Sequence, residues 1–322
     1  MRNPKIFLNL YLFFTLILTL IYIKIMKSYN LYLYALDPTH IGSGGYRLGR
    51  VDNTILRDAG TQLPKIPGSS ISGTTRSAAI YSLDKNDREI AMRYANATLG
   101  KEGYKREHSG KDDPVAKIFG FAEGDEDGTS QIGAVSFRDA EILAFPIPTM
   151  LGTKWITTAY LLKCVGINIP EPTSEEEIFV QENTNHPKQL NLGWLLFTNI
   201  STKKIPFVKT GVPQIDNIEK NLIIVHDNIF SALVNANLET RTSVSIDFET
   251  GAACSGALFT YEATPRGTLF RGQIDFDDKR YPDLKDYGIN LVKNALNLSC
   301  NLGLGAMTTR GFGRMQHTLI EM

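Results

Sequence analysis

The segment KSYNLYLYALDPTHIG, residues 27–42, determines how the chain begins to fold. Its first half alternates as a β-strand does, and Asp37-Pro38 then breaks the alternation. We therefore predict a strand over residues 30–36. The loop that follows, DPTHIGSGG, is rich in turn-forming residues, and a short extended piece, NTILRD, continues from it.

The rest of the chain alternates between helical and strand-like patterns. Helices are predicted over 69–83, where Ser69 or Ser70 can cap the first turn, and over 153–166, 227–236 and 287–300. Strands are predicted in the remaining patterned stretches, which are QIGAVSFRDAEILAFPIP, RTSVSIDFET, GALFTYEATP, TLFRGQIDF and the C-terminal segment. This mixture predicts an α+β fold.

Length and composition fit one elaborated globular domain. The chain has 322 residues, a formal net charge of zero and three widely spaced cysteines, which indicate free thiols in a reducing compartment such as the cytoplasm. A neutral chain is not a general polycation, so an anionic partner needs a local basic surface. Polar insertions are predicted near residues 84–131 and 167–190.

An apolar run, residues 6–23, precedes the first predicted strand. Its length is close to that of a membrane-spanning helix, which would make it an anchor or an uncleaved signal. The alternative, which we favour, is that translation begins at Met26, so that residues 1–25 are a mis-assigned leader. A single domain would then span 26–322, with no membrane association expected.

Two glycine-rich loops are candidates for binding phosphate. GLGAMTTRGFGR, residues 303–314, matches neither a dinucleotide fingerprint nor a P-loop, yet Arg310 and Arg314 could hold phosphate there; a plain turn is the alternative. At the start of the helix predicted over 69–83, Ser69 and Ser70 lie among free amide groups that favour an anion, and Arg76 follows two turns later. A simple N-cap would also explain these serines.

Familiar catalytic centres are not evident in the sequence. The five histidines lack metal-binding spacings, and no GxSxG serine motif occurs. The acidic run at 123–127 does not match an EF-hand and is read as a solvated turn. Asp52, at the end of HIGSGGYRLGRVD (residues 40–52), therefore stands out as a carboxylate that a structural loop does not explain.

Taken in order, these motifs resemble the RAMP superfamily of CRISPR-associated proteins, and within it the backbone subunits of type III-B (Cmr) effector complexes. The resemblance covers residues 28–322 and is carried by ALDPTHIGSG, GRVDNTILRD, LPKIPGSSISGTTRS, GLGAMTTRGFGR and the blocks 132–158 and 226–272. One departure is Ser72, where relatives carry a lysine.

The resemblance implies an RRM-like (ferredoxin-like) palm with large insertions and a β-hairpin thumb within 222–274. It also implies a helical filament of copies along a CRISPR guide RNA, with other type III subunits, whose thumbs flip bases so that target RNA is cleaved at regular intervals. Cleavage would depend on a divalent metal ion, magnesium or manganese, and would use Asp52, with Asp58 as the competitor for that role.

RNA contacts are expected from the loop residues His40, Gly42, Ser43, Gly44, Arg50, Ser69, Ser70, Arg76, Arg310, Gly311, Gly313 and Arg314. His40 could alternatively act as a base or order its loop. Two other functions stay open at this point: a filament subunit that has lost catalysis, and a RAMP-type endoribonuclease that processes guide RNA on its own.

Overall fold

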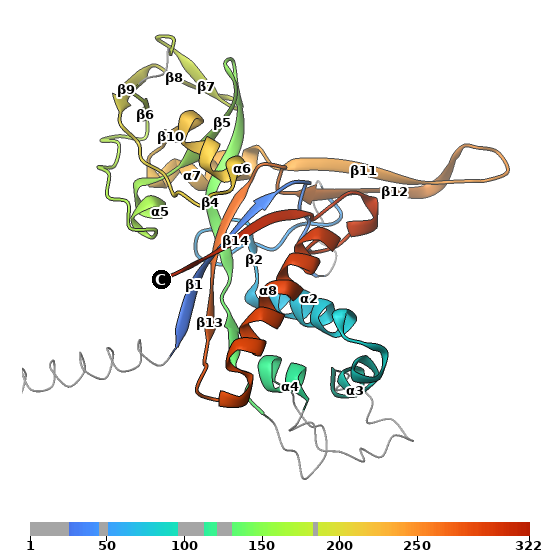
Figure 1. The fold of residues 1–322 in the computed structure, drawn as a ribbon. Helices are drawn as coiled ribbons and strands as arrows, with labels where there is room; N and C mark the ends of the chain where they lie inside the picture. Colours follow the sequence, from blue (N-terminus) through green and yellow to red (C-terminus); the bar gives the residue numbers. More distant parts are fainter. Residues whose placement is uncertain (1–25, 45–50, 96–112, 121–130, 183–185) are drawn as a thin grey trace, which may run out of the picture.

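The computed structural model of the chain describes residues 26–44, 51–95, 113–120, 131–182 and 186–322. It is an α+β protein, as predicted, built on one large sheet in the strand order β14-β1-β13-β4-β5-β10-β6-β9 (Figure 1). Two short strands extend the sheet, because β2 pairs with β4 and β3 pairs with β13. The ten strands are β1 (Lys27–Ala35), β2 (Lys65–Ile66), β3 (Val135–Phe137), β4 (Ala140–Thr149), β5 (Gly152–Thr157), β6 (Glu177–Gln181), β9 (Asn199–Lys203), β10 (Leu222–Ile224), β13 (Leu269–Phe276) and β14 (Met315–Glu321).

Four of these strands form an antiparallel unit with two helices on one face. Along the chain the unit runs β1, α2, β4, β13, α8, β14, and its spatial order is β14-β1-β13-β4. Leu31 and Leu33 of β1 are buried in the core with Leu296 of α8, whereas Tyr32 belongs to a separate core cluster. This alternation is what a strand buried on both faces requires. The helices are α2 (Gly68–Ser82), α3 (Lys85–Ala95), α4 (Pro114–Phe119), α5 (Ala159–Lys163), α6 (Pro213–Asp216), α7 (Asp227–Ala236) and α8 (Lys285–Leu302).

The other half of the sheet carries a lobe formed by residues 150–236 (Figure 1). Its strands run in mixed directions, since β5 pairs with β10 in parallel and β10 pairs with β6 antiparallel. A small hairpin of β7 (Leu190–Leu192) and β8 (Leu195–Phe197) lies at its edge. Short 3-10 helices complete the chain: η2 (Asn217–Asn221), η3 (Pro282–Leu284) and η4 (Thr308–Arg310).

A long hairpin projects from the opposite side of the molecule (Figure 1). Its strands, β11 (Glu239–Ile246) and β12 (Ala253–Ala263), form a separate two-stranded sheet. Most side chains of β11 are exposed to solvent. A two-stranded ribbon of this kind is only marginally stable by itself.

Most of the predicted elements are present, including the first strand and the helices over 227–236 and 287–300. The helix predicted over 153–166 is wrong: strand β5 occupies its first half, and only α5 is helical. The segment TKWITT is rich in β-branched residues and an aromatic, and it pairs with both β4 and β10. The segment 167–190, predicted as a polar insertion, contains the mostly buried strand β6.

The predicted serine cap of α2 is also wrong. Pro67 occupies the N-cap position and no side chain caps the helix from there. Instead the Gly68 amide donates to Asp139 Oδ1 at 2.8 Å, so the carboxylate just before β4 accepts one of the free amides at the helix terminus. Within the part of the chain described, no helix is both long and apolar enough to cross a membrane, and the predicted leader lies outside the described residues.

Candidate active site

Four segments that are distant in sequence meet where the β11–β12 hairpin joins the body. The backbone amides of Thr39 and Thr264 each donate to the carbonyl of the other, both at 2.9 Å. The Asn53 amide donates to the Thr260 carbonyl at 3.1 Å. From the C-terminal loop, the Ala306 amide donates to the carbonyl of His40 at 2.9 Å. We call the assembly of residues 37–44, 51–58, 259–264 and 303–314 the hairpin-root cluster.

Asp52 lies exposed in this cluster, attached to strand β12. Its Oδ2 accepts the Thr260 amide at 2.7 Å and the Thr260 hydroxyl at 3.0 Å. The Asp52 amide in turn donates to Thr260 Oγ1 at 3.1 Å. These donors, the backbone amide first, hold the pKa of Asp52 below its usual value. Both donors of Thr260 reach Oδ2, so the carboxylate is held at one oxygen while the residue stays exposed.

Asp58, the competing candidate, is committed to its own turn. Its Oδ1 accepts the amides of Gly60 and Thr61 at 3.0 and 3.1 Å, and Oδ2 pairs with Lys65 at 3.3 Å. The Thr61 amide and Lys65 together lower the pKa of Asp58 to about 2. With both oxygens engaged, Asp58 is an Asx-turn residue that stabilises the loop.

A charged network under the loop fixes the segment that carries Asp52. Glu262 accepts the Ile55 amide at 3.3 Å and receives Arg57 Nη2 at both oxygens, at 3.2 and 3.0 Å. Arg57 also donates Nε to Asn235 of α7 at 2.8 Å. Because both side chains are largely buried, this two-point pair links loop, hairpin and helix with a defined geometry.

Aromatic side chains pack on the other side of the hairpin root. His40 is buried, with Nδ1 against the Glu262 carbonyl and its ring edge-to-face with Tyr261 at 6.2 Å. The ring centroids of Tyr261 and Phe312 lie 5.5 Å apart, and Cζ of the Arg241 guanidinium lies 4.8 Å from the centroid of the Phe312 ring. The burial of His40 supports the alternative in which its ring orders the loop; its role as a general base remains untested.

The glycines predicted to contact RNA differ in what their positions require. Gly313 has φ +82°, and a Cβ there would lie 2.4 Å from the Leu304 carbonyl oxygen, so it serves close backbone packing. At Gly311 (φ +79°) and Gly44 (φ +72°), none of the described residues beyond the chain neighbours has an atom within 4 Å of where a Cβ would stand. Gly42 is exposed beside the His40 ring, and Ser43 Oγ lies 2.9 Å from Thr54 Oγ1.

Of the predicted cations, Arg310 and Arg314 lie in the cluster and Arg76 does not. Arg314 forms a two-point ion pair with Asp37, which raises the arginine pKa and lowers the aspartate pKa. Arg310 is exposed at the end of η4. Arg76 is half-buried in α2, where desolvation lowers its pKa and Asp113 of the α4 cap is its charged neighbour. Arg50 lies outside the described residues.

Ser69 and Ser70 begin α2, whose first amide is already taken by Asp139. A phosphate at this terminus would therefore compete with an internal carboxylate. The structure thus brings together His40, Gly42, Ser43, Gly44, Asp52 and the 310–314 loop, and leaves Ser69, Ser70 and Arg76 outside that cluster. The contact of each of these residues with RNA stays a prediction.

A divalent ion would find one protein carboxylate here. Within the described residues, no three His, Cys, Asp or Glu side chains lie close enough together to hold a metal. Asp52 is exposed, and the Thr260 donors occupy Oδ2, so Oδ1 can supply a single oxygen ligand. Mg²⁺ is commonly bound through one or two carboxylates with substrate phosphates and water as the other ligands, and this donor set fits that pattern.

Sequence reasoning missed the residues that hold Asp52 in place. Thr260 and Glu262 lie on one face of β12, and they reach Asp52 and Arg57 across more than 200 positions of sequence. The alternation in GALFTYEATP indicated part of this arrangement, because it places the side chains of Thr260 and Glu262 on the same face of the strand. Their partners could not be read from it.

Comparison with known proteins shows the family. The RAMP superfamily model matches residues 32–316. The chain is 30% identical over 319 residues to the CRISPR system Cmr endoribonuclease Cmr4 of Pyrococcus furiosus, covering 92% of this chain and 97% of that protein.

Solved structures share the fold. The type III-B Cmr-beta complex bound to cognate target RNA contains a chain that matches with TM-score 0.61 at 17% identity, covering 91% of this chain and 96% of that one. Oligomeric Cmr4 from Pyrococcus furiosus matches with TM-score 0.56 at 22% identity, covering 92% and 98%. The chain therefore belongs to the RAMP superfamily and, within it, resembles the Cmr4 proteins of type III-B systems.

Proposed function

We propose that this protein is the guide-RNA-binding filament subunit of a cytoplasmic type III-B CRISPR effector complex, and that it cleaves the bound target RNA. The observation that carries the proposal is Asp52: an exposed carboxylate held at Oδ2 by Thr260, at the root of a projecting hairpin. The relative at 30% identity is named a Cmr endoribonuclease, which supports the activity.

In this proposal the four-stranded unit with α2 and α8 is the RRM-like palm and the β11–β12 hairpin is the thumb. Val244 and Leu258 are cross-strand partners in the middle of the hairpin, and both are exposed. Apolar side chains inserted between base steps unstack and kink a nucleic acid duplex. This pair is suited to separating two base pairs of the guide–target duplex close to Asp52.

The chemistry needs little from the protein. The 2′-hydroxyl of the target attacks the adjacent phosphorus, the bond to the 5′-oxygen breaks, and the products are a 2′,3′-cyclic phosphate and a 5′-hydroxyl. A kinked backbone allows the in-line arrangement that this step requires. A bound divalent ion would supply charge neutralisation at the phosphate. Asp52 Oδ1 would hold that ion, while Thr260 keeps the carboxylate in place and ionised.

The exposed backbone and cations of the cluster would receive RNA phosphates. Gly42, Ser43, Gly44 and Gly311 allow close approach to the backbone, and Arg310 is the exposed cation beside them. Arg314 can also bind phosphate to the extent that Asp37 leaves its positive charge unneutralised. Several stacked copies would share one guide RNA, so each needs only a modest basic surface.

The test is target-RNA cleavage by complexes assembled with Asp52→Ala, with Asp58→Asn as the matched control. We expect Asp52→Ala to abolish cleavage at every interval while the complex still binds its target, and Asp58→Asn to cleave normally. A subunit that only builds the filament would give unchanged cleavage with both variants. A guide-processing enzyme would cut repeat RNA as an isolated chain.

A further inference from the structure

Helix α7 of the lobe is hydrogen-bonded at three points to the loop that follows the candidate catalytic aspartate. Arg57 Nε donates to Asn235 Oδ1 at 2.8 Å, and Asn235 Nδ2 donates to the carbonyl of Gln62 at 3.0 Å. One turn earlier on the helix, Ser231 Oγ donates to the carbonyl of Thr61 at 2.9 Å. Side chains from the lobe therefore hold this loop in place.

The Arg57 guanidinium connects these contacts to the backbone next to Asp52. Its Nε binds Asn235, its Nη2 binds both carboxylate oxygens of Glu262 on β12, and its Nη1 donates to the carbonyl of Ile55 at 3.1 Å. The Ile55 amide donates to the same Glu262 carboxylate at 3.3 Å. A planar guanidinium makes these contacts in fixed directions, which a lysine could not reproduce. Ile55 lies three residues after Asp52, so a short series of directed bonds joins the lobe to Asp52.

Gln62 has a backbone conformation that its neighbours must maintain. Its φ is +58°, in the left-handed region that residues other than glycine seldom adopt. Residues of this kind persist only where the surrounding structure fixes them, and they are frequent at functional sites. The Gln62 carbonyl is the group that Asn235 binds. The lobe thus helps to keep the turn in a shape that it would not favour by itself.

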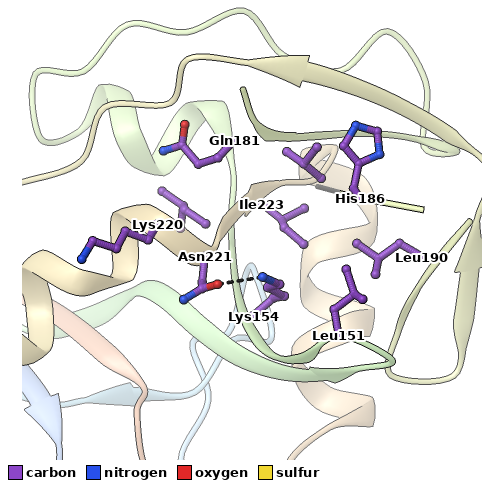
Figure 2. A pocket seen from close by; sticks show the side chains of 10 residues that line it. Leu151, Lys154, Gln181, His186, Leu190, Lys220, Asn221 and Ile223 are labelled. Carbon is purple, nitrogen blue, oxygen red and sulfur yellow. Dashed lines mark hydrogen bonds between the residues drawn. The ribbon is translucent and has the colours of Figure 1, made fainter. Parts of the chain in front are cut away.

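Helix α7 is itself built firmly into the lobe. Three of its apolar side chains are buried in one core cluster: Phe230, Leu233 and Val234. Leu190 and Ile223 belong to the same cluster and line a small pocket of the lobe (Figure 2). Only residues 237 and 238 separate α7 from strand β11 of the hairpin. Any displacement of the lobe would therefore carry Asn235 with it.

We propose that Asn235 of the lobe is a positioning residue for target cleavage and that it acts on Asp52 through Arg57. Ser231 supports the same contact from one turn away. Without the Asn235 amide, residues 53–62 would lose their attachment to α7, and the bonds between Asp52 and Thr260 would become less well aligned. The inference rests on the proposed cleavage function, and it gives the lobe a part in setting the geometry of the site.

The test is single-turnover cleavage of a labelled target RNA by assembled complexes, measured across pH at saturating target. We expect Asn235→Ala to lower the rate constant about 10-fold, while the affinity for target RNA changes less than about two-fold. The acid limb of the rate–pH profile should also shift to higher pH, because a loosened loop weakens the Thr260 bonds that lower the pKa of Asp52. A residue that only stabilises the fold would change the amount of active complex, and neither the rate constant nor the acid limb.

Two variants on the same helix provide the comparison. Asn228→Ala removes an exposed amide that donates to Glu175, within the lobe, at 2.9 Å, and it should cleave with the unmodified rate constant and pH profile. Ser231→Ala removes the bond to the Thr61 carbonyl and keeps Asn235, so it should lower the rate constant by a smaller factor, about three-fold.

A double variant tests the route through the arginine. If Asn235 acts through Arg57, Asn235→Ala added to Arg57→Ala should slow cleavage no further than Arg57→Ala alone. The proposal is overturned if Asn235→Ala cleaves with the unmodified rate constant and pH profile, if Asn228→Ala is equally slow, or if the effects of the Arg57 and Asn235 changes multiply. Failure of the proposed catalytic function appears separately, as normal cleavage with Asp52→Ala.

Discussion

Replacing Thr260 with valine would test whether the geometry of Asp52 controls cleavage. Valine has the same shape but cannot make the two hydroxyl bonds that Thr260 Oγ1 shares with Asp52, at 3.0 and 3.1 Å. Only the amide bond at 2.7 Å would remain, which fixes one oxygen at a single point. The carboxylate could then swing by about 1 Å, and misplacement of that size typically costs about 10- to 100-fold in rate.

The same variant should change how cleavage depends on pH. Thr260 lowers the pKa of Asp52 through its amide and its hydroxyl, so loss of the hydroxyl raises that pKa. Asp52 is then protonated at a higher pH, so the acid limb of the rate–pH profile should shift to higher pH. Thr260→Ser keeps the hydroxyl and should restore both rate and profile.

The assay is single-turnover cleavage of a labelled target RNA by assembled complexes, measured across pH with saturating target. A variant that only destabilised the hairpin would lower the amount of active complex without moving the acid limb. The reasoning would be refuted if Thr260→Val cleaved with the rate and pH profile of the unmodified protein.

Three further predictions concern the loops around the site and are measured as free energies of unfolding in urea. Gly313→Ala should cost at least about 2 kcal/mol, because the position has a positive φ and the new Cβ would lie 2.4 Å from the Leu304 carbonyl oxygen. Gly311→Ala also has a positive φ but no such clash, and it should cost about 1 kcal/mol. Equal costs for the two variants would contradict the packing argument. Glu262→Gln should lose about 1–3 kcal/mol because it weakens a largely buried pair, while exposed Glu182→Gln should be neutral. The pKa of Asp58 is lowered from 3.8 to about 2, so its ionised form stabilises the protein fully above pH 3.8, and this stabilisation is lost as the pH falls to about 2. The loss in free energy of unfolding caused by Asp58→Asn should therefore shrink over the same pH range. A loss that does not change with pH would argue against this role of Asp58.

The sequence predicted elements whose pattern is local. The helix over 227–236 shows an amphipathic repeat, and its bounds are those of α7. The segment 153–166 was mispredicted because its strand character comes from pairing with β4 and β10, and those contacts override a helical pattern. The cap of α2 was mispredicted for a similar reason, since Asp139, which satisfies it, lies 71 positions away.

The candidate site, like the fold, was predicted from the sequence only in part. Asp52 was singled out from its loop and from the family resemblance, and the structure separates it from Asp58 through the different bonds of the two carboxylates. Thr260 could not be found in advance, because its contact with Asp52 depends on how the hairpin joins the loop across 208 positions. Long-range pairing of this kind leaves no periodic signal in either segment.

The measurement that tests the central claim most directly is target cleavage by complexes that contain Asp52→Ala, run beside Asp58→Asn and the unmodified protein with equal amounts of bound target. We expect the Asp52 variant to bind its target and leave it intact at every interval, and the Asp58 variant to cleave it. Cleavage at the unmodified rate and positions by the Asp52 variant would contradict the account.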